Sequence, residues 1–113
     1  MRTLANALQL GLLLACTAMP ALAAEATPAN DAIGIGHDLV RTYCAECHAV
    51  EATGDSPLAI APHFRDLHTR YPIDDLAEAL VEGIVTAHPT MPEFEFDPDQ
   101  ALAIIDYIKS LNP

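Results

Sequence analysis

The stretch CAECH at positions 44–48 constrains this chain more than any other feature of its sequence. Two cysteines stand three positions apart, and a histidine follows the second one directly. The same spacing occurs in redox-active disulfides, in half of a zinc site and in covalent haem attachment. Each possibility requires different partners elsewhere in the chain, so the remaining sequence decides among them.

Residues 1–23 are predicted to be a secretory signal peptide. Arg2 is their only charged residue, positions 8–14 are apolar except for Gln9, and small residues surround the expected cleavage point after Ala23. This order is typical of exported proteins. Two alternatives stay open: acylation of Cys16, as in a bacterial lipoprotein, or retention of the segment as an N-terminal anchor. In each case we expect the folded domain in the periplasm, without membrane insertion of the mature domain.

The acidic balance of the chain restricts its partners. The sequence has 16 Asp and Glu against 5 Lys and Arg, a formal net charge of −11. Such a surface argues against binding to nucleic acid or to anionic lipid. It favours docking to a partner protein through a basic surface on that partner, or it simply keeps the protein soluble.

The mature chain is too small to depend on its own side chains for a core. About 90 residues remain after removal of the signal, and a chain of that size buries only about 60–65 % of its unfolded surface. Three Phe, three Tyr and no Trp are available. Two cysteines so close in sequence would close only a tiny loop and would add little stability. Another source of stability is therefore required.

Helix signals predict an all-α domain of three main helices joined by long loops, after a flexible lead-in at 24–30. The sequence DPDQ at 97–100 combines a capping aspartate, a first-turn proline and a glutamine that can reach back to the cap. The expected helices run from 30 or 31 to about 47, from about 72 to 83, and from 98 to about 111. Loops cover 49–70, with one helical turn at 63–68, and 85–96; long loops in so small a domain usually surround a functional site.

Two of the three explanations of CAECH lack their partners. A redox disulfide belongs in a βαβ unit, and the chain has no period-two strand pattern. A tetrahedral zinc site needs four ligands, but no second pair exists among His37, His63, His68 and His88. Covalent haem remains, because two thiols on one helical turn can reach both vinyl groups of the porphyrin and place His48 beneath the iron. We expect one haem c, bound through Cys44 and Cys47.

Met91 is the expected second axial ligand of the iron. It is the only methionine after the signal, and it lies in the proline-stiffened loop HPTMPEF. His88, in the same loop, is the alternative ligand. His63 and His68 are more distant candidates that should face solvent, and His37 is expected on the surface of the first helix.

These features resemble the class I cytochromes c, the small helical electron carriers of bacterial periplasm and mitochondria, over nearly the whole mature chain. Gly36 stands eight residues before Cys44, where the family has a glycine that lets the first and last helices cross closely. Tyr107 in DYIKSL matches the aromatic partner of that glycine. The resemblance implies a cytochrome c domain over residues 31–113.

The resemblance also assigns a role to a proline after the motif. Its carbonyl accepts a hydrogen bond from the ligating histidine, and Pro62 in APHF matches it, with Pro57 as the alternative. The family's methionine is often followed by proline and an apolar residue, as Met91 is followed by Pro92 and Phe94.

The chain departs from the family pattern at three points. Val40 stands where an aromatic residue is frequent, and the acidic balance differs from the basic mitochondrial members. The tryptophan near the haem propionates is absent, and its best substitute is Tyr71 with Arg65 or Arg70.

The expected function is transfer of one electron at a haem edge near Cys44 and Cys47. Iron ligated by histidine and methionine has no position open for a substrate, so we expect a monomeric electron carrier that serves redox partner proteins, and not an enzyme. Two alternatives stay open. One is a haem domain with a labile or missing sixth ligand, acting in peroxide reduction or gas sensing. The other is a cytochrome subunit of a periplasmic oxidoreductase complex.

Overall fold

The structure is a computed structural model that describes residues 28–83 and 90–112. Its elements are α1 (Pro28–Tyr43), the 3-10 turns η1 (Phe64–Thr69) and η2 (Ile73–Asp75), α2 (Leu76–Glu82) and α3 (Pro98–Ser110). No β-strand occurs within these two ranges, in agreement with the all-α expectation. The expected signal peptide lies outside the described residues, as does most of the lead-in at 24–30.

Helix α1 differs from its expected bounds at both ends. It begins at Pro28, inside the expected lead-in. Proline lacks an amide hydrogen, and the first turn of a helix needs none, so Pro28 can start the helix. It ends at Tyr43 and not near Cys47, because the Ala45 amide donates to the Val40 carbonyl at 3.1 Å and widens the last turn. The motif CAECH therefore forms a separate turn, in which the His48 amide donates to the Cys44 carbonyl at 2.9 Å.

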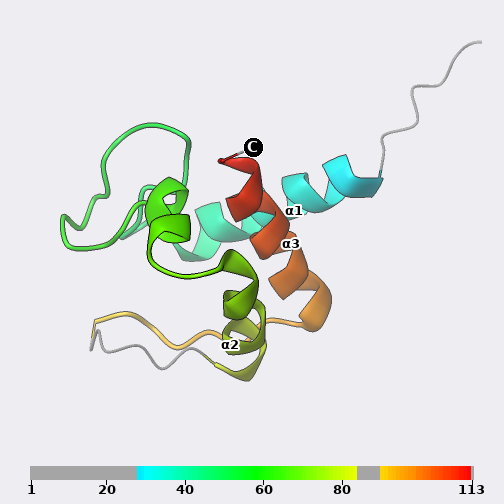
Figure 1. The fold of residues 1–113 in the computed structure, drawn as a ribbon. Coiled ribbons are helices and arrows are strands. Elements are labelled where there is room, and N and C mark those ends of the chain that lie inside the picture. The colour runs from blue at the N-terminus through cyan, green and yellow to red at the C-terminus, as the bar shows by residue number, and fades with distance from the viewer. Residues whose placement is uncertain (1–27, 84–89, 113) are drawn as a thin grey trace, which may run out of the picture.

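The crossing of α1 and α3 is the centre of the fold (Figure 1). Gly36 is buried there, and a Cβ added to it would overlap the Ala103 carbonyl and lie 2.8 Å from the Tyr107 Cβ. The close approach inferred for Gly36 and Tyr107 is therefore confirmed. Val40, one turn further along α1, is fully buried in the same core.

Helix α3 supplies most of the core, and its start follows the sequence signals. The Asp97 amide donates to Gln100 Oε1 at 3.2 Å, as expected for the capping box. The spacing of Leu102 from Ile105 and Ile108 predicts that it lies on the apolar face of α3, but this prediction is wrong, because Leu102 is 55 % exposed. At 100° per residue its side chain falls between Asp106 and Lys109 on the polar side of the helix. The buried residues are Ala101, Ala103, Ile104, Ile105, Tyr107 and Ile108.

The expected second helix is divided into two parts. Pro72 precedes the 3-10 turn η2, and the α-helical part α2 starts at Leu76. Gly83 ends α2 with a φ of 93°, in the left-handed region that glycine adopts without strain. Lys109 on α3 forms an ion pair with Asp74 in η2. None of the helices described is long and apolar enough to cross a bilayer.

Candidate functional site

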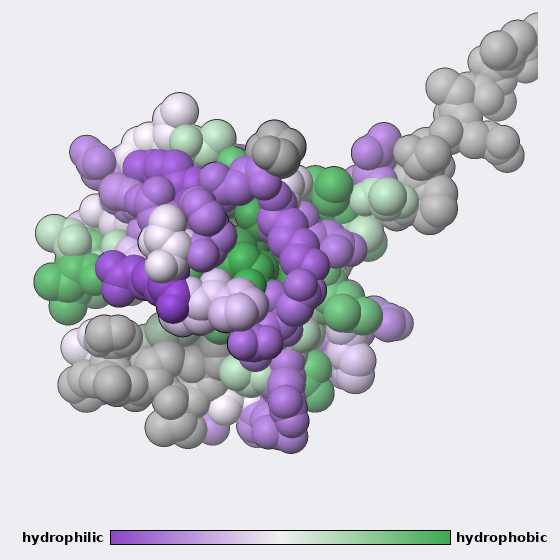
Figure 2. Space-filling view, viewed as in Figure 1, coloured by the Kyte–Doolittle hydropathy of each residue, from purple (hydrophilic) through white to green (hydrophobic). Residues whose placement is uncertain are grey.

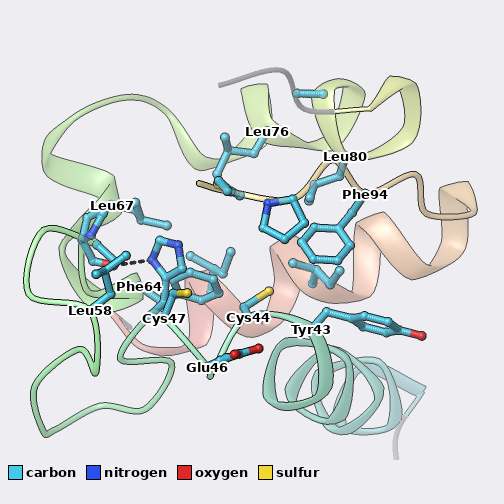
Figure 3. A pocket seen from close by; sticks show the side chains of 18 of the residues that line it. Tyr43, Cys44, Glu46, Cys47, Leu58, Phe64, Leu67, Leu76, Leu80 and Phe94 are labelled. Carbon is cyan, nitrogen blue, oxygen red and sulfur yellow. Dashed lines mark hydrogen bonds between the residues drawn. The ribbon is translucent and has the colours of Figure 1, made fainter. Parts of the chain in front are cut away.

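A cavity of about 420 Å³ opens between the motif turn, the loop before η1, α2 and the segment after residue 89 (Figure 3). Ile104 and Ile108 of α3 line its base. We call one side the His48 wall: Tyr43, Cys44, Glu46, Cys47, His48, Leu58, Ile60, Ala61, Pro62, Phe64, Leu67 and Tyr71. We call the other side the Met91 wall: Leu76, Ala79, Leu80, Thr90, Met91, Pro92, Phe94 and Phe96.

The site residues named from the sequence meet at this cavity. Its lining includes Cys44, Cys47, His48, Pro62 and Met91, which come from three separate segments. The alternative ligand His88 lies outside the described residues.

The three other histidines within the described ranges do not line the cavity, and each has a partner of its own. His37 Nε2 lies 2.9 Å from Glu51 Oε1, His63 Nδ1 lies 2.9 Å from an Arg65 nitrogen, and His68 Nδ1 donates to the Arg65 carbonyl at 2.8 Å.

The His48 ring is oriented by the backbone that follows the motif. Its Nδ1 donates to the Pro62 carbonyl at 2.8 Å (Figure 3), so in the neutral ring Nε2 carries the lone pair that can bind a metal. The Phe64 amide donates to the Ala49 carbonyl at 2.9 Å and holds Pro62 beside the ring. The structure thus places Pro62 beside His48, whereas the alternative, Pro57, does not line the cavity.

The two cysteines at the cavity are not joined in a disulfide. In Figure 3 the Cys44 and Cys47 side chains both extend from the motif turn into the cavity, which His48 also lines. Before the haem is attached, burial raises the pKa of the Cys44 thiol to about 11.

Aromatic contacts between the two walls escaped the sequence analysis. The Tyr43 ring meets Phe94 and Phe96 edge-on, with ring centroids 5.8 and 5.4 Å apart. The Phe94 and Phe96 rings are 5.9 Å from each other. Tyr43 and Phe94 are far apart in the chain, and no local pattern predicts such a pair. The sequence offers one signal for this contact: Tyr43 lies next to Cys44, and Phe94 lies three residues after Met91.

A second missed group lies behind the motif. The Tyr107 hydroxyl donates to the Val50 carbonyl at 2.8 Å and to Glu51 Oε2 at 3.3 Å. The His37 ring packs on Tyr107 with centroids 5.0 Å apart. The hydrogen bond from His37 holds the pKa of the Glu51 carboxyl below its usual range. This group connects α1, α3 and the chain that leaves the motif.

The residues present fit a haem. The lining is mainly aliphatic and aromatic, as an apolar macrocycle requires, and it includes two cysteine side chains and one oriented imidazole. Of the residues suggested for the propionates, Tyr71 lines the cavity. Arg65 does not line it, and its guanidinium instead lies 2.9 Å from His63 Nδ1. No group of three or more His, Cys, Asp or Glu within 28–83 and 90–112 is arranged to hold a metal ion.

Comparison with known proteins leads to the same assignment. The family model described as Cytochrome c matches residues 34–112. A cytochrome c-552 of Bradyrhizobium diazoefficiens is 36% identical over 102 residues, which are 90% of this chain and 89% of that protein. No solved structure matches the chain significantly. The chain therefore belongs to the class I cytochromes c: it is a helical electron-transfer protein with one haem c attached covalently through Cys44 and Cys47.

Proposed function

We propose that this protein is a periplasmic one-electron carrier in which His48 and Met91 are the axial ligands of the haem iron. The observation that carries the proposal is the meeting of His48 and Met91 on one cavity, although 43 positions separate them in the sequence. The bound haem supplies an iron that takes up and releases one electron. The side chains around the haem bind it, orient its ligands and set the polarity of its surroundings.

His48 and Met91 have different roles. The Pro62 carbonyl fixes the tautomer and the orientation of His48, and the hydrogen bond makes the imidazole a stronger donor. A thioether is a soft ligand that favours the reduced iron and raises the potential. The apolar walls act in the same direction, because a low-dielectric site disfavours the additional charge of the oxidised centre. Two protein ligands leave no position for a substrate, which supports a carrier over an enzyme.

The periplasmic location rests on the pattern of residues 1–23 and on the family's covalent haem. An apolar segment with one N-terminal basic residue is typical of exported proteins. Mass spectrometry of the purified protein will test this part. Removal of residues 1–23 should leave Ala24 as the first residue with one added haem, whereas an acylated Cys16 would give a heavier chain that starts at that residue.

We propose that the redox partner presents a basic surface. The net charge is −11, and Figure 2 shows hydrophilic residues across the top and middle of the face in view. Opposite charges accelerate association, and salt screens them. The rate of electron exchange with the partner should therefore fall as ionic strength rises, and a rate that is independent of salt would contradict this proposal.

The absorption spectrum of the holoprotein tests the ligands. The ferric protein should be low-spin and should show the weak near-infrared band of iron–thioether bonding. Met91→Ala should remove that band and lower the potential, while the control His88→Ala should change neither. Persistence of the band in Met91→Ala would refute the assignment. Rapid binding of carbon monoxide to the reduced wild-type protein would instead support a gas-binding haem.

A further inference from the structure

We propose that Tyr43 is a positioning residue for Met91. Its ring holds residues 90–96, which we call the Met91 segment, against the end of α1, directly before Cys44. The inference rests on the proposed ligation by Met91. It concerns a contact between the two walls of the cavity.

The geometry of three rings carries this inference. Tyr43 belongs to the last turn of α1 and to the His48 wall, while Phe94 and Phe96 belong to the Met91 segment. Both pairs that include Tyr43 are edge-on, at interplanar angles of 64° and 77°. An edge-on pair places the positive edge of one ring against the negative face of the other, so it restricts orientation as well as distance. One ring of the His48 wall thus contacts two rings of the Met91 segment.

The other attachments of the Met91 segment lead to different parts of the fold. The Phe96 amide donates to the Leu80 carbonyl at 2.9 Å, which ties the segment to α2. Asp97, the residue that follows the segment, is held by the cap of α3. At the end of α2, Glu93 and Glu95 lie beside Gly83, and Glu82 directly precedes this glycine. Several negative charges are therefore close together at this point. The aromatic contact is the attachment that leads directly to the haem-binding motif.

Tyr43 is a firm support because of its neighbour in the sequence. It directly precedes Cys44, whose covalent bond to the haem fixes this end of α1 relative to the iron. A side chain that packs against Tyr43 is therefore held in a fixed position relative to the haem. Phe94 is three residues after Met91, so its position limits how far the methionine can move away from the cavity.

Tyr43 can be replaced without opening the core. It is 47 % exposed, whereas Phe96 is 8 % exposed and fully part of the hydrophobic cluster. Tyr43→Leu removes both ring contacts, and Tyr43→Phe keeps the ring and removes only the hydroxyl. Ile35→Ala is the matched control, because Ile35 is a half-exposed apolar residue of the same helix, at 54 % exposure, and does not line this cavity.

The experiment follows the near-infrared band of the ferric holoprotein as the pH is raised until the methionine leaves the iron. Loss of two aromatic pairs should shift the equilibrium toward release on the order of tenfold, so the midpoint for Tyr43→Leu should fall by about one pH unit. Tyr43→Phe and Ile35→Ala should retain the wild-type midpoint. Phe94→Leu should lower the midpoint by a smaller amount, because the pair between Tyr43 and Phe96 remains. Combined with Tyr43→Leu it should give less than the sum of the two shifts, because both changes remove the pair between Tyr43 and Phe94.

The outcomes separate this inference from the proposed ligation. If the band survives Met91→Ala, the ligation itself is wrong. If the band is lost in Met91→Ala but its midpoint is unchanged in Tyr43→Leu, the positioning role of Tyr43 is overturned and the ligation stands. Equal shifts in Tyr43→Leu and Ile35→Ala would also overturn it, as would full additivity of Tyr43→Leu and Phe94→Leu.

Discussion

The two walls of the cavity are built in different ways. The His48 wall is held by backbone hydrogen bonds, among them Leu58 to Cys47 at 3.1 Å and Phe64 to Ala49 at 2.9 Å, and by the bond from His48 to Pro62. The Met91 wall consists of α2, which has seven residues with none fully buried, and of a segment without regular secondary structure. Its contact with the His48 wall is made by aromatic side chains.

This difference implies different behaviour of the two proposed axial ligands, His48 and Met91. A ligand oriented through backbone bonds keeps its place as long as the fold persists. A ligand oriented through side-chain contacts can leave while the fold remains intact, since such contacts open locally at a lower free energy. Variants behind the His48 wall should therefore lower global stability, and variants in the Met91 wall should release the ligand first.

The largest expected effect comes from the crossing behind the His48 wall. Gly36→Ala introduces a Cβ that overlaps the Ala103 carbonyl, so the free energy of unfolding should fall by about 1–3 kcal/mol. Gly34→Ala is the control on the same helix, where an added Cβ meets nothing within 4 Å. It should gain up to about 1 kcal/mol from reduced chain entropy. Denaturant unfolding of both holoproteins tests the contrast, and equal stabilities would contradict it.

The next effect lies in the Met91 wall. Gly83 has a φ of 93°, and a Cβ added there would lie 2.8 Å from Glu93 Oε1. Gly83→Ala should cost about 1–2 kcal/mol through backbone strain and crowding, and the near-infrared band should vanish well before the helices unfold. Gly54→Ala has the same φ with no atom within 4 Å of the added Cβ, so it isolates the strain. Simultaneous loss of the band and of helical circular dichroism in Gly83→Ala would erase the proposed contrast between the walls.

Tyr107→Phe should have a smaller effect, again on global stability. It leaves the buried Val50 carbonyl without the hydroxyl that donates to it, at a cost of about 1 kcal/mol. The near-infrared band should persist until the protein unfolds. A band that disappears first would show that α3 also controls the Met91 wall.

The same hydroxyl provides a test in alkali. Burial, and then the negative charge of Glu51, raises the pKa of Tyr107 to about 12, above its ordinary value of about 10. The folded state therefore disfavours the ionised form, and stability that is present below about pH 10 should be lost as the pH rises toward 12. This loss should be absent in Tyr107→Phe, which makes the difference between the two proteins shrink over that range.

The smallest effect concerns Glu51. The hydrogen bond from His37 lowers the pKa of this carboxyl, so its contribution is present above the ordinary value and is lost as the pH falls through the depressed one. Because the side chain is 51 % exposed, solvent screens it, and Glu51→Gln should cost only a few tenths of a kcal/mol at neutral pH. Acid unfolding curves should converge below about pH 4. Asp106→Asn, an exposed acid on α3, is the control and should leave the curve unchanged.

Local signals allowed much of this molecule to be predicted from its sequence. The cap at Asp97, the stop at Gly83 and the close approach at Gly36 each depend on a residue type that the backbone requires there. The motif CAECH also predicted the cofactor, because two thiols and an imidazole at that spacing are typical of few sites other than covalent haem.

What was not predicted depends on contacts between distant residues. Leu102 matched the helical period but lies on the polar side of α3. The wide turn that ends α1 at Tyr43 and the ring of Phe94 that meets it have no signature in either segment alone. Side-chain contacts across the cavity form only when the two walls are packed together. The contact of Tyr43 with Phe94 and Phe96, which we propose positions Met91, therefore could not be predicted from the sequence.

The crossing at Gly36 also has a consequence for the order of events during biogenesis. It joins a residue near the start of the domain to Ala103 near its end, so the central contact is among the most non-local in the chain. The core cannot form until the residues of α3 have been synthesised and are free to fold. Throughout that interval the motif at 44–48 is already available, which opens a period for covalent attachment before the cavity walls come together.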